Sequence, residues 1–356
     1  MGNLYKTIDN HVHIAGCGDV YPDDLYWSKL FEEGIGFQAL KILKGWGCKK
    51  VGDQLMIDAL CKQINAANSI DYAVVLAFDN VYDADGTYCG PKQTGAGQIK
   101  SNLFVSNKFV FGLCQATPKL LPGISVHPFR ENALGELDNY EDKAVLCKWM
   151  PSAHLIDFDN PQVQTKLENF YIKLAEIQLP LLLHTGVEAS IPSSDKRFNK
   201  YNNPAYIEKA LDLGVTVILA HCGCSYFDLL EDNFVNEALK LFEKLRTVKP
   251  SWRLYADISA LFSPFRKRKI LDRIFKTIPA SQLIYGSDFP NPAKGRREFF
   301  LRSFLRFSKA NLLNRYFNIT SKWLPEYYSQ SDTFLILTNF HRLLDKLGRG
   351  HLVVPS

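Results

Sequence analysis

The sequence predicts an α/β fold, a closed (β/α)₈ TIM barrel of parallel strands. One observation is that eight short apolar runs recur along the 356-residue chain. Another is that these runs are apolar at nearly every position, as strands buried on both faces are. Segments with helical periodicity lie between them. An open, doubly wound sheet is the alternative, but no glycine-rich phosphate fingerprint follows the first run. The number of runs therefore favours the barrel.

The predicted strands follow one another at the spacing of βα units. In order they are Lys6–Ile8 (leading into His11), Tyr72–Phe78, Gly123–Val126, Ala144–Trp149, Pro180–His184, Thr216–His221, Leu254–Asp257 and Leu283–Gly286. Apolar residues at three- and four-residue spacing predict helices between them. These helices are expected at Val163–Ile177, Ala205–Asp212, Phe234–Arg246 and Phe265–Ile278.

Three segments are additional to the eight βα units of a minimal barrel. Gly16–Gly52 and Asn80–Gln98 are long excursions after the first and second strands, and loops of that length usually cover a functional site. From about Arg296 the chain is rich in aromatic residues and predicts the last barrel helix plus extra C-terminal helices packed outside. With no internal repeat or low-complexity linker in the sequence, we expect one domain over residues 1–356, with the helical extension starting near residue 300.

Composition narrows the class of protein. Hydrophobic residues make up 46% and charged residues 22%, which is ordinary for a globular protein. The net charge of +5 is spread out, so neither nucleic acid nor a membrane is an expected partner. The polar N-terminus and the dispersed cysteines predict a cytoplasmic protein. We expect a small-molecule substrate, and the aromatic C-terminal helices leave a homo-oligomer open.

Histidines fall where the predicted strands end. His11 and His13 are two apart in an extended segment, so both imidazoles point to one face and can share an ion. His184 and His221 close the fifth and sixth runs, and Asp288 follows the eighth. Because the C-terminal strand ends of a barrel surround one mouth, these side chains should meet there. Nitrogen and oxygen ligands of this kind predict a divalent-ion site.

Other polar residues also end strands. Lys148 ends the fourth, where it is either an ammonium that reaches the mouth or pairs with an acid, or a lysine carboxylated by CO₂ that bridges two ions. His127, Arg130 and His154 are candidate substrate contacts, although such residues often only cap barrel loops. Asp9 is a candidate acceptor for the outer nitrogens of the metal-binding histidines by proximity, with a surface carboxylate as the more ordinary interpretation.

Over roughly residues 6 to 300 the chain resembles the amidohydrolase superfamily, the metal-dependent barrel hydrolases. The likeness is closest to the branch of small-molecule amidohydrolases and aminocarboxymuconate-semialdehyde-decarboxylase-like enzymes. It rests on the motifs HVH (11–13), KWMP (148–151), LLLHTG (181–186), ILAHCG (218–223) and YGSDFP (285–290).

The resemblance implies a role for each residue. His11, His13 and Asp288 would bind the first ion. In two-ion members Lys148 would bridge, with His184 and His221 on the second ion. In one-ion members His184 joins the first ion and His221 orients water or substrate. Asp288 would act as general base and then acid. The cofactor expected is one or two divalent ions, zinc first and manganese as an alternative.

The predicted function is hydrolysis of an amide, lactone or ester bond in a small molecule by a water that the metal activates, with an Asp as general base. The alternative is a nonoxidative metal-dependent decarboxylase or hydratase, in which His221 and Arg130 help to hold a carboxylate. A barrel that binds without catalysis is a third hypothesis. The state of Lys148 separates the first two: carboxylation between two ions favours hydrolysis.

Overall fold

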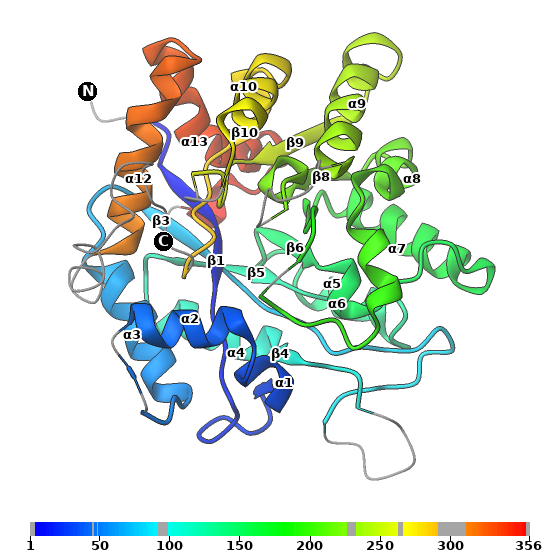
Figure 1. Cartoon of the computed structure of the whole chain (residues 1–356). Helices are drawn as coiled ribbons and strands as arrows, with labels where there is room; N and C mark the ends of the chain where they lie inside the picture. Colours follow the sequence, from blue (N-terminus) through cyan, green and yellow to red (C-terminus); the bar gives the residue numbers. More distant parts are fainter. Residues whose placement is uncertain are drawn as a thin grey trace.

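The computed structural model describes residues 4–44, 46–47, 49–91, 99–188, 190–225, 233–262, 266–290 and 311–353. Within them, eight parallel strands form one sheet that curves into a nearly closed barrel (Figure 1). The predicted α/β barrel is therefore confirmed. In sheet order the strands are β1 (Ile8–His13), β3 (Tyr72–Leu76), β5 (Leu120–Ile124), β6 (Leu146–Trp149), β7 (Leu181–Leu183), β8 (Thr216–Leu219), β9 (Arg253–Asp257) and β10 (Leu283–Ile284).

The segment after β10 closes the barrel against β1. The backbone N–H of Asn10 donates to the carbonyl of Tyr285 at 3.2 Å, and that of His13 donates to Phe289 at 2.8 Å. In the other direction, the N–H of Asp288 donates to the carbonyl of His11 at 2.9 Å. The closing seam thus places the last predicted ligand beside the first two.

All eight strands differ from their predicted bounds, six of them by one or two residues at an end and β1 and β5 by more. β1 extends through His13, because its ladder with β3 continues to the pair His13–Leu76. The third barrel strand is Leu120–Ile124 where Gly123–Val126 was predicted, since its ladder with β3 runs from Leu120 to Gly123. Pro122 lies inside this strand, and a proline is an ordinary signal of a strand boundary. That signal explains the error.

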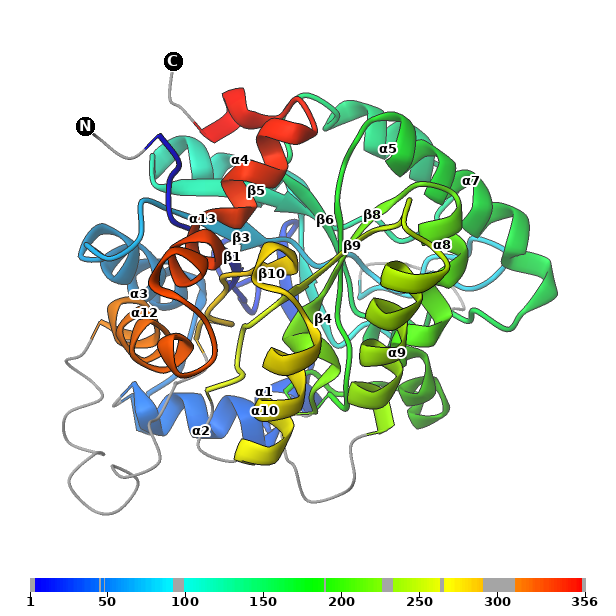
Figure 2. The ribbon, with the colours of Figure 1, turned by 90° about the horizontal axis from the view of Figure 1, so that it is seen from above.

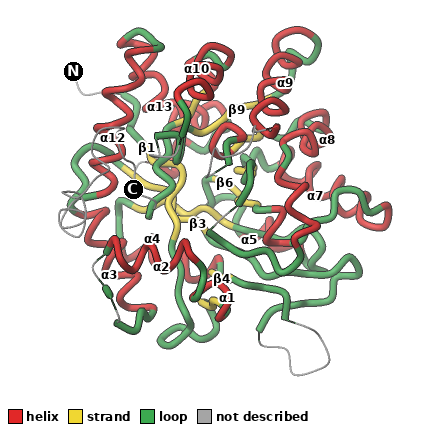
Figure 3. Tube along the Cα trace, in the orientation of Figure 1, coloured by secondary structure: helices red, strands yellow, loops and turns green. Residues whose placement is uncertain are grey.

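Helices surround the strands, as Figure 3 shows in red around yellow. The outer helices are α3 (Asp53–Asn65), α4 (Asn107–Ala116), α5 (Ala133–Asn139), α7 (Gln164–Glu176), α8 (Glu208–Asp212), α9 (Asn233–Thr247) and α10 (Arg268–Thr277). The predicted helical segments are found, with Phe265 outside the described residues. In α7 the buried residues recur at the predicted helical spacing and pack against the barrel: Leu167, Phe170, Tyr171 and Leu174.

The C-terminal helices are α12 (Leu312–Trp323) and α13 (Gln330–Lys346). α13 does more than pack on the outside of the barrel. Its Phe340, Leu343 and Leu344 share a core cluster with barrel residues such as Ile8 and Leu182. This helix therefore covers the N-terminal end of the barrel interior (Figure 2). None of the helices in the described part of the chain has the length and apolar character that a bilayer crossing requires.

At the opposite end of the barrel, the first long excursion pairs with the segment that follows the second. β2 (Leu25–Trp27) belongs to the first excursion and β4 (Leu103–Val105) follows the second, and they form an antiparallel ribbon. Helices α1 (Lys29–Glu32) and α2 (Ile35–Leu43) follow β2, and the short α6 (Pro151–His154) follows β6. The buried Asp53 carboxylate anchors the first excursion by accepting the backbone N–H groups of Gly18, Val20 and Tyr21 at 2.9–3.0 Å. Residues 92–98 of the second excursion lie outside the described residues.

Candidate metal centre

Three of the predicted ligands converge at the mouth of the barrel. The Nε2 atoms of His11 and His13 lie 3.1 Å apart. Oδ1 of Asp288 lies 3.2 Å from Nε2 of His13 and 3.5 Å from Nε2 of His11. His11 is fully buried, whereas the His13 side chain keeps 24% of its surface exposed. The three groups thus surround one point that solvent can approach from the His13 side.

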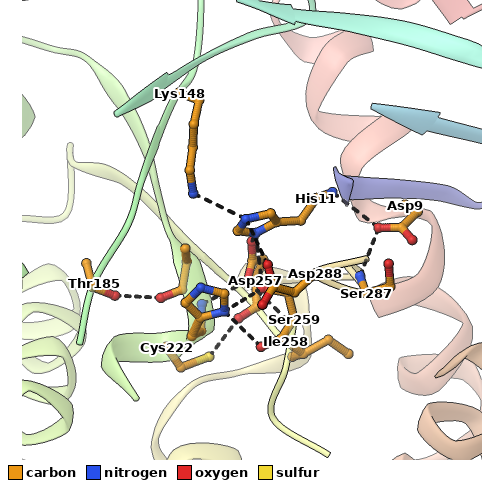
Figure 4. Close-up of polar contacts among 12 residues, drawn as sticks. Asp9, His11, Lys148, Thr185, Cys222, Asp257, Ile258, Ser259, Ser287 and Asp288 are labelled. Atoms are coloured by element: carbon orange, nitrogen blue, oxygen red, sulfur yellow. Dashed lines mark hydrogen bonds and ion pairs between the residues drawn. The ribbon is translucent and has the colours of Figure 1, made fainter. Parts of the chain in front are cut away.

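A buried carboxylate sets the tautomer of His11. Nδ1 of His11 lies 2.8 Å from Oδ2 of Asp257, so this nitrogen carries the proton and donates it (Figure 4). The lone pair is then on Nε2, the atom that faces His13 and Asp288. Burial lowers the pKa of His11 to about 3, so the ring is neutral at neutral pH. Neutral rings with one lone pair directed inward are what a metal ion requires.

Asp257 also organises the neighbouring strand end. Its Oδ1 accepts the backbone N–H groups of His221 at 2.8 Å and Ser259 at 3.1 Å, and the Ser259 hydroxyl also donates to it. Burial raises the pKa of Asp257, but His11, His221 and Ser259 together lower it more, and the net shift is downward. The sequence analysis did not assign Asp257 a role. The available signal was its place at the end of a predicted strand.

His221 and Asp288 both have left-handed backbone conformations, with φ of 59° and 61°. Non-glycine residues there cost about 1–3 kcal/mol each, and they persist where the surroundings hold them. The backbone N–H of His221 is held by Asp257, and that of Asp288 by the carbonyl of His11. The His221 ring stacks on His11 with centroids 5.1 Å apart, and its Nδ1 lies 2.8 Å from the Ser259 hydroxyl. This strain therefore orients two predicted site residues.

His184 joins the same cluster with a carboxylate that the sequence analysis missed. The His184 ring centroid lies 5.1 Å from that of His221, and burial lowers the His184 pKa well below its usual range. Oε2 of Glu188 lies 3.2 Å from Nε2 of His184, and both side chains are nearly buried. Glu188 belongs to the loop after β7, where sequence offers no strand end to mark it.

Lys148 reaches the cluster from β6. Its side chain is fully buried, and Nζ lies 3.2 Å from Nε2 of His11 (Figure 4). Burial lowers the pKa of Lys148 to about 8. Its Nζ thus lies buried at the mouth, and the described residues place no carboxylate oxygen within 4 Å of it, so the predicted pairing with an acid is not found.

Asp9 is neither the acceptor for the outer nitrogen of a metal-binding histidine nor a surface carboxylate, the two roles predicted for it. It is fully buried, so it is not a surface carboxylate. Its Oδ1 accepts the backbone N–H groups of His11 at 3.2 Å and Ser287 at 2.8 Å, and the acceptor for the outer nitrogen of His11 is Asp257 instead. Burial raises the pKa of Asp9 to about 7. Asp9 therefore ties β1 to the segment that carries Asp288.

His127 and Arg130 lie in a network of their own. The Nε2–H of His127 donates to the His154 carbonyl at 2.8 Å, and its Nδ1 accepts the backbone N–H of Phe129 at 3.2 Å. Both ring nitrogens thus bind backbone, which leaves neither for a substrate. Arg130 forms ion pairs with two carboxylates, at 3.2 Å and 3.9 Å, and these belong to Asp79 and Glu136.

His154, the third predicted substrate contact, has a ring nitrogen without a hydrogen-bond partner among the described residues. It is fully buried, and its ring lies 4.3 Å from that of Phe78. Nδ1 accepts the backbone N–H of Met150 at 3.2 Å, so the proton of the neutral ring is on Nε2. Among the described residues, Nε2 has no hydrogen-bond partner. This residue therefore presents a buried N–H donor without an acceptor.

Comparisons with known proteins agree with this architecture. An uncharacterised TIM-barrel protein from Bordetella bronchiseptica superimposes with a TM-score of 0.55 at 15% identity, covering 97% of this chain and 100% of the other. An amidohydrolase from Burkholderia multivorans with bound HEPES gives a TM-score of 0.54 at 12% identity, covering 96% and 99%. At such identities the likeness concerns the fold. The comparison with curated proteins found no match.

The sequence profile of the amidohydrolase family matches residues 107–310, more than half of the chain. The matched segment includes Lys148, His184, His221 and Asp288, and it begins after His11 and His13. The chain belongs to the amidohydrolase family.

Proposed function

We propose that this protein is a metal-dependent hydrolase that cleaves an amide, lactone or ester bond in a small molecule. The observation that carries the proposal is the convergence of His11, His13 and Asp288 at the barrel mouth, with the tautomer of His11 set by Asp257. Family membership supports an enzyme of this class.

The three ligand atoms fit a divalent ion. Zinc bonds to nitrogen and oxygen of about 2.0–2.1 Å at tetrahedral angles put two ligand atoms about 3.3 Å apart. The separations among His11, His13 and Asp288 are 3.1, 3.2 and 3.5 Å. We infer that these residues hold the first ion, zinc before manganese. When bound, such an ion lowers the pKa of a water ligand and polarises a carbonyl group.

We propose that Asp288 transfers the proton of the reaction and that His221 orients the reacting groups. Burial raises the pKa of Asp288, but the surrounding histidines, His221 first, lower it more, and the net shift is downward. Asp288 is therefore a carboxylate at neutral pH, as a general base must be. We propose that it takes the proton of the attacking water onto a carboxylate oxygen and delivers it to the leaving group. His221, held by Ser259, would orient the reacting groups.

A second ion would occupy the neighbouring position. We propose that Lys148 is carboxylated by CO₂, which turns a buried amine into an anionic bridging ligand, and that His184 and His221 hold the second ion. The burial of Lys148 and its 3.2 Å approach to His11 support this arrangement. An amine that stayed cationic there would face the ion's own charge.

We propose that His154 contacts the substrate. Its Nε2–H donor is buried and lacks a partner among the described residues, so a substrate oxygen would satisfy it. The decarboxylase alternative has less support, because it needs an arginine for a substrate carboxylate. Arg130 is already paired with Asp79 and Glu136.

The test is metal content together with turnover. Protein purified without chelators should contain one or two zinc or manganese ions per chain, and should cleave at least one member of a panel of esters, lactones and amides. His13→Ala and Asp288→Asn should abolish turnover, while His351→Ala, at an exposed histidine, should leave it unchanged. Absence of a stoichiometric divalent ion would overturn the proposal. Turnover of carboxylated aromatics alone would favour the decarboxylase.

A further inference from the structure

We propose that Glu188 is an additional ligand of the second ion, binding it through Oε2 beside Nε2 of His184. The inference rests on the proposed function, because it presumes a metal centre at this mouth. It adds a carboxylate from the loop after β7 to a set otherwise supplied by strand ends.

The contact between the two side chains is not a hydrogen bond. Oε2 of Glu188 and Nε2 of His184 are 3.2 Å apart, yet Nε2 has no hydrogen-bond partner among the described residues. The two atoms therefore lie 3.2 Å apart without a hydrogen bond between them. Two ligands on one zinc ion are about 3.3 Å apart. The pair thus repeats the spacing found between His13 and Asp288, 3.2 Å.

The loop holds the Glu188 carboxylate with one oxygen and leaves the other for a ligand. Oε1 accepts the backbone N–H of Ile191 at 2.8 Å and also that of Ser190. The preceding residue is held as well, since the N–H of Val187 donates to the Ser225 hydroxyl at 2.9 Å. A ligand whose geometry is set before the ion arrives loses little entropy on binding.

Burial of this carboxylate calls for a cation. The Glu188 side chain is 9% exposed, and a buried charge is costly unless it is paired. Among the described residues its ion-pair partner is the His184 imidazole, at 3.2 Å. A divalent ion between them would supply the missing positive charge. The competing role, a counter-ion to a cationic Lys148, needs no second ion and predicts a different metal count.

The experiment measures cobalt or zinc binding to the full chain by competition with a chromophoric chelator. Wild-type protein should bind two ions. Glu188→Gln keeps the shape and an oxygen for Ser190 and Ile191 but removes the charge. It should keep the first ion and bind the second about 10-fold or more weakly, with an altered cobalt absorption spectrum. Glu168→Gln, at a surface carboxylate paired with Lys209, is the matched control and should bind as wild type.

The outcomes separate this inference from the proposed function. If Glu188→Gln binds both ions with wild-type affinity, Glu188 is not a ligand and the two-ion hydrolase stands. If the wild type binds only one ion, Glu188 is again not a ligand and the one-ion hydrolase stands. If the wild type binds none, both proposals fall. His13→Ala gives the reciprocal result, weakening the first ion while Glu188 keeps the second. Thermal unfolding of the metal-free variants checks that each is folded.

Discussion

Replacing Asp257 by Asn tests whether the tautomer of His11 is imposed from behind the metal centre. The Asp257 carboxylate accepts the His11 Nδ1–H through Oδ2. Its Oδ1 accepts the N–H groups of His221 and Ser259 and the Ser259 hydroxyl. Asn has one acceptor oxygen and one donor NH₂. Because three donors meet one side of the group and a single donor meets the other, the oxygen should remain with His221 and Ser259.

The NH₂ then faces Nδ1 of His11, which must become an acceptor, and its proton moves to Nε2. That atom loses the lone pair that the first ion needs. Changing the partner behind a metal-binding histidine typically costs 10–100-fold in affinity, which is about 1.4–2.7 kcal/mol. In the metal-free protein all four hydrogen bonds to residue 257 become neutral ones, so its free energy of unfolding should fall by about 2–4 kcal/mol.

Chelator competition gives the affinity of the first ion, and urea unfolding of the metal-free protein gives the stability. The control is Asp58→Asn, an exposed carboxylate on α3, which should change neither quantity. A first-ion affinity for Asp257→Asn within twofold of wild type would refute the reasoning. So would a loss of more than about 6 kcal/mol in metal-free stability, because the oxygen would then no longer accept from His221 and Ser259.

Three further predictions concern stability, each measured by urea unfolding. Burial holds the pKa of His127 near 3 against about 6.5 in the unfolded chain, so its neutral form stabilises the fold above pH 6.5, and that stability falls as the pH drops from 6.5 towards 3. The loss between pH 7 and 5 should be about 2 kcal/mol smaller in His127→Gln, and an equal loss would contradict this. Gly186 has φ of 92°, and a Cβ there would lie 2.3 Å from the Cys224 carbonyl oxygen, so Gly186→Ala should cost more than about 2 kcal/mol; a neutral result would refute it. Arg349 donates to four carbonyls at the far end of the barrel, so Arg349→Met should cost about 3–5 kcal/mol without changing metal affinity, and a weaker metal site would count against that separation.

The sequence alone was sufficient for the barrel and for most of the side chains at its mouth, with Asp257 and Glu188 as the exceptions. Strands buried on both faces leave continuous apolar runs, and parallel strands all end at the same side. For that reason the sequence predicts that His11, His184, His221 and Asp288 lie together. The same logic placed Lys148 at the mouth, where it lies beside His11.

Only the tertiary structure decided how these groups interact. Which carboxylate meets the outer nitrogen of His11 depends on strand curvature and on the left-handed turns after β8 and β10, so Asp257 replaced Asp9 in that role. Glu188 lies in a loop whose path is set by contacts with distant residues. Arg130 forms an ion pair with Asp79, a residue 51 positions away in the chain, and local sequence does not indicate this partner. Local sequence carries strand and helix preference, whereas the direction of a side chain depends on contacts that form only when the barrel closes.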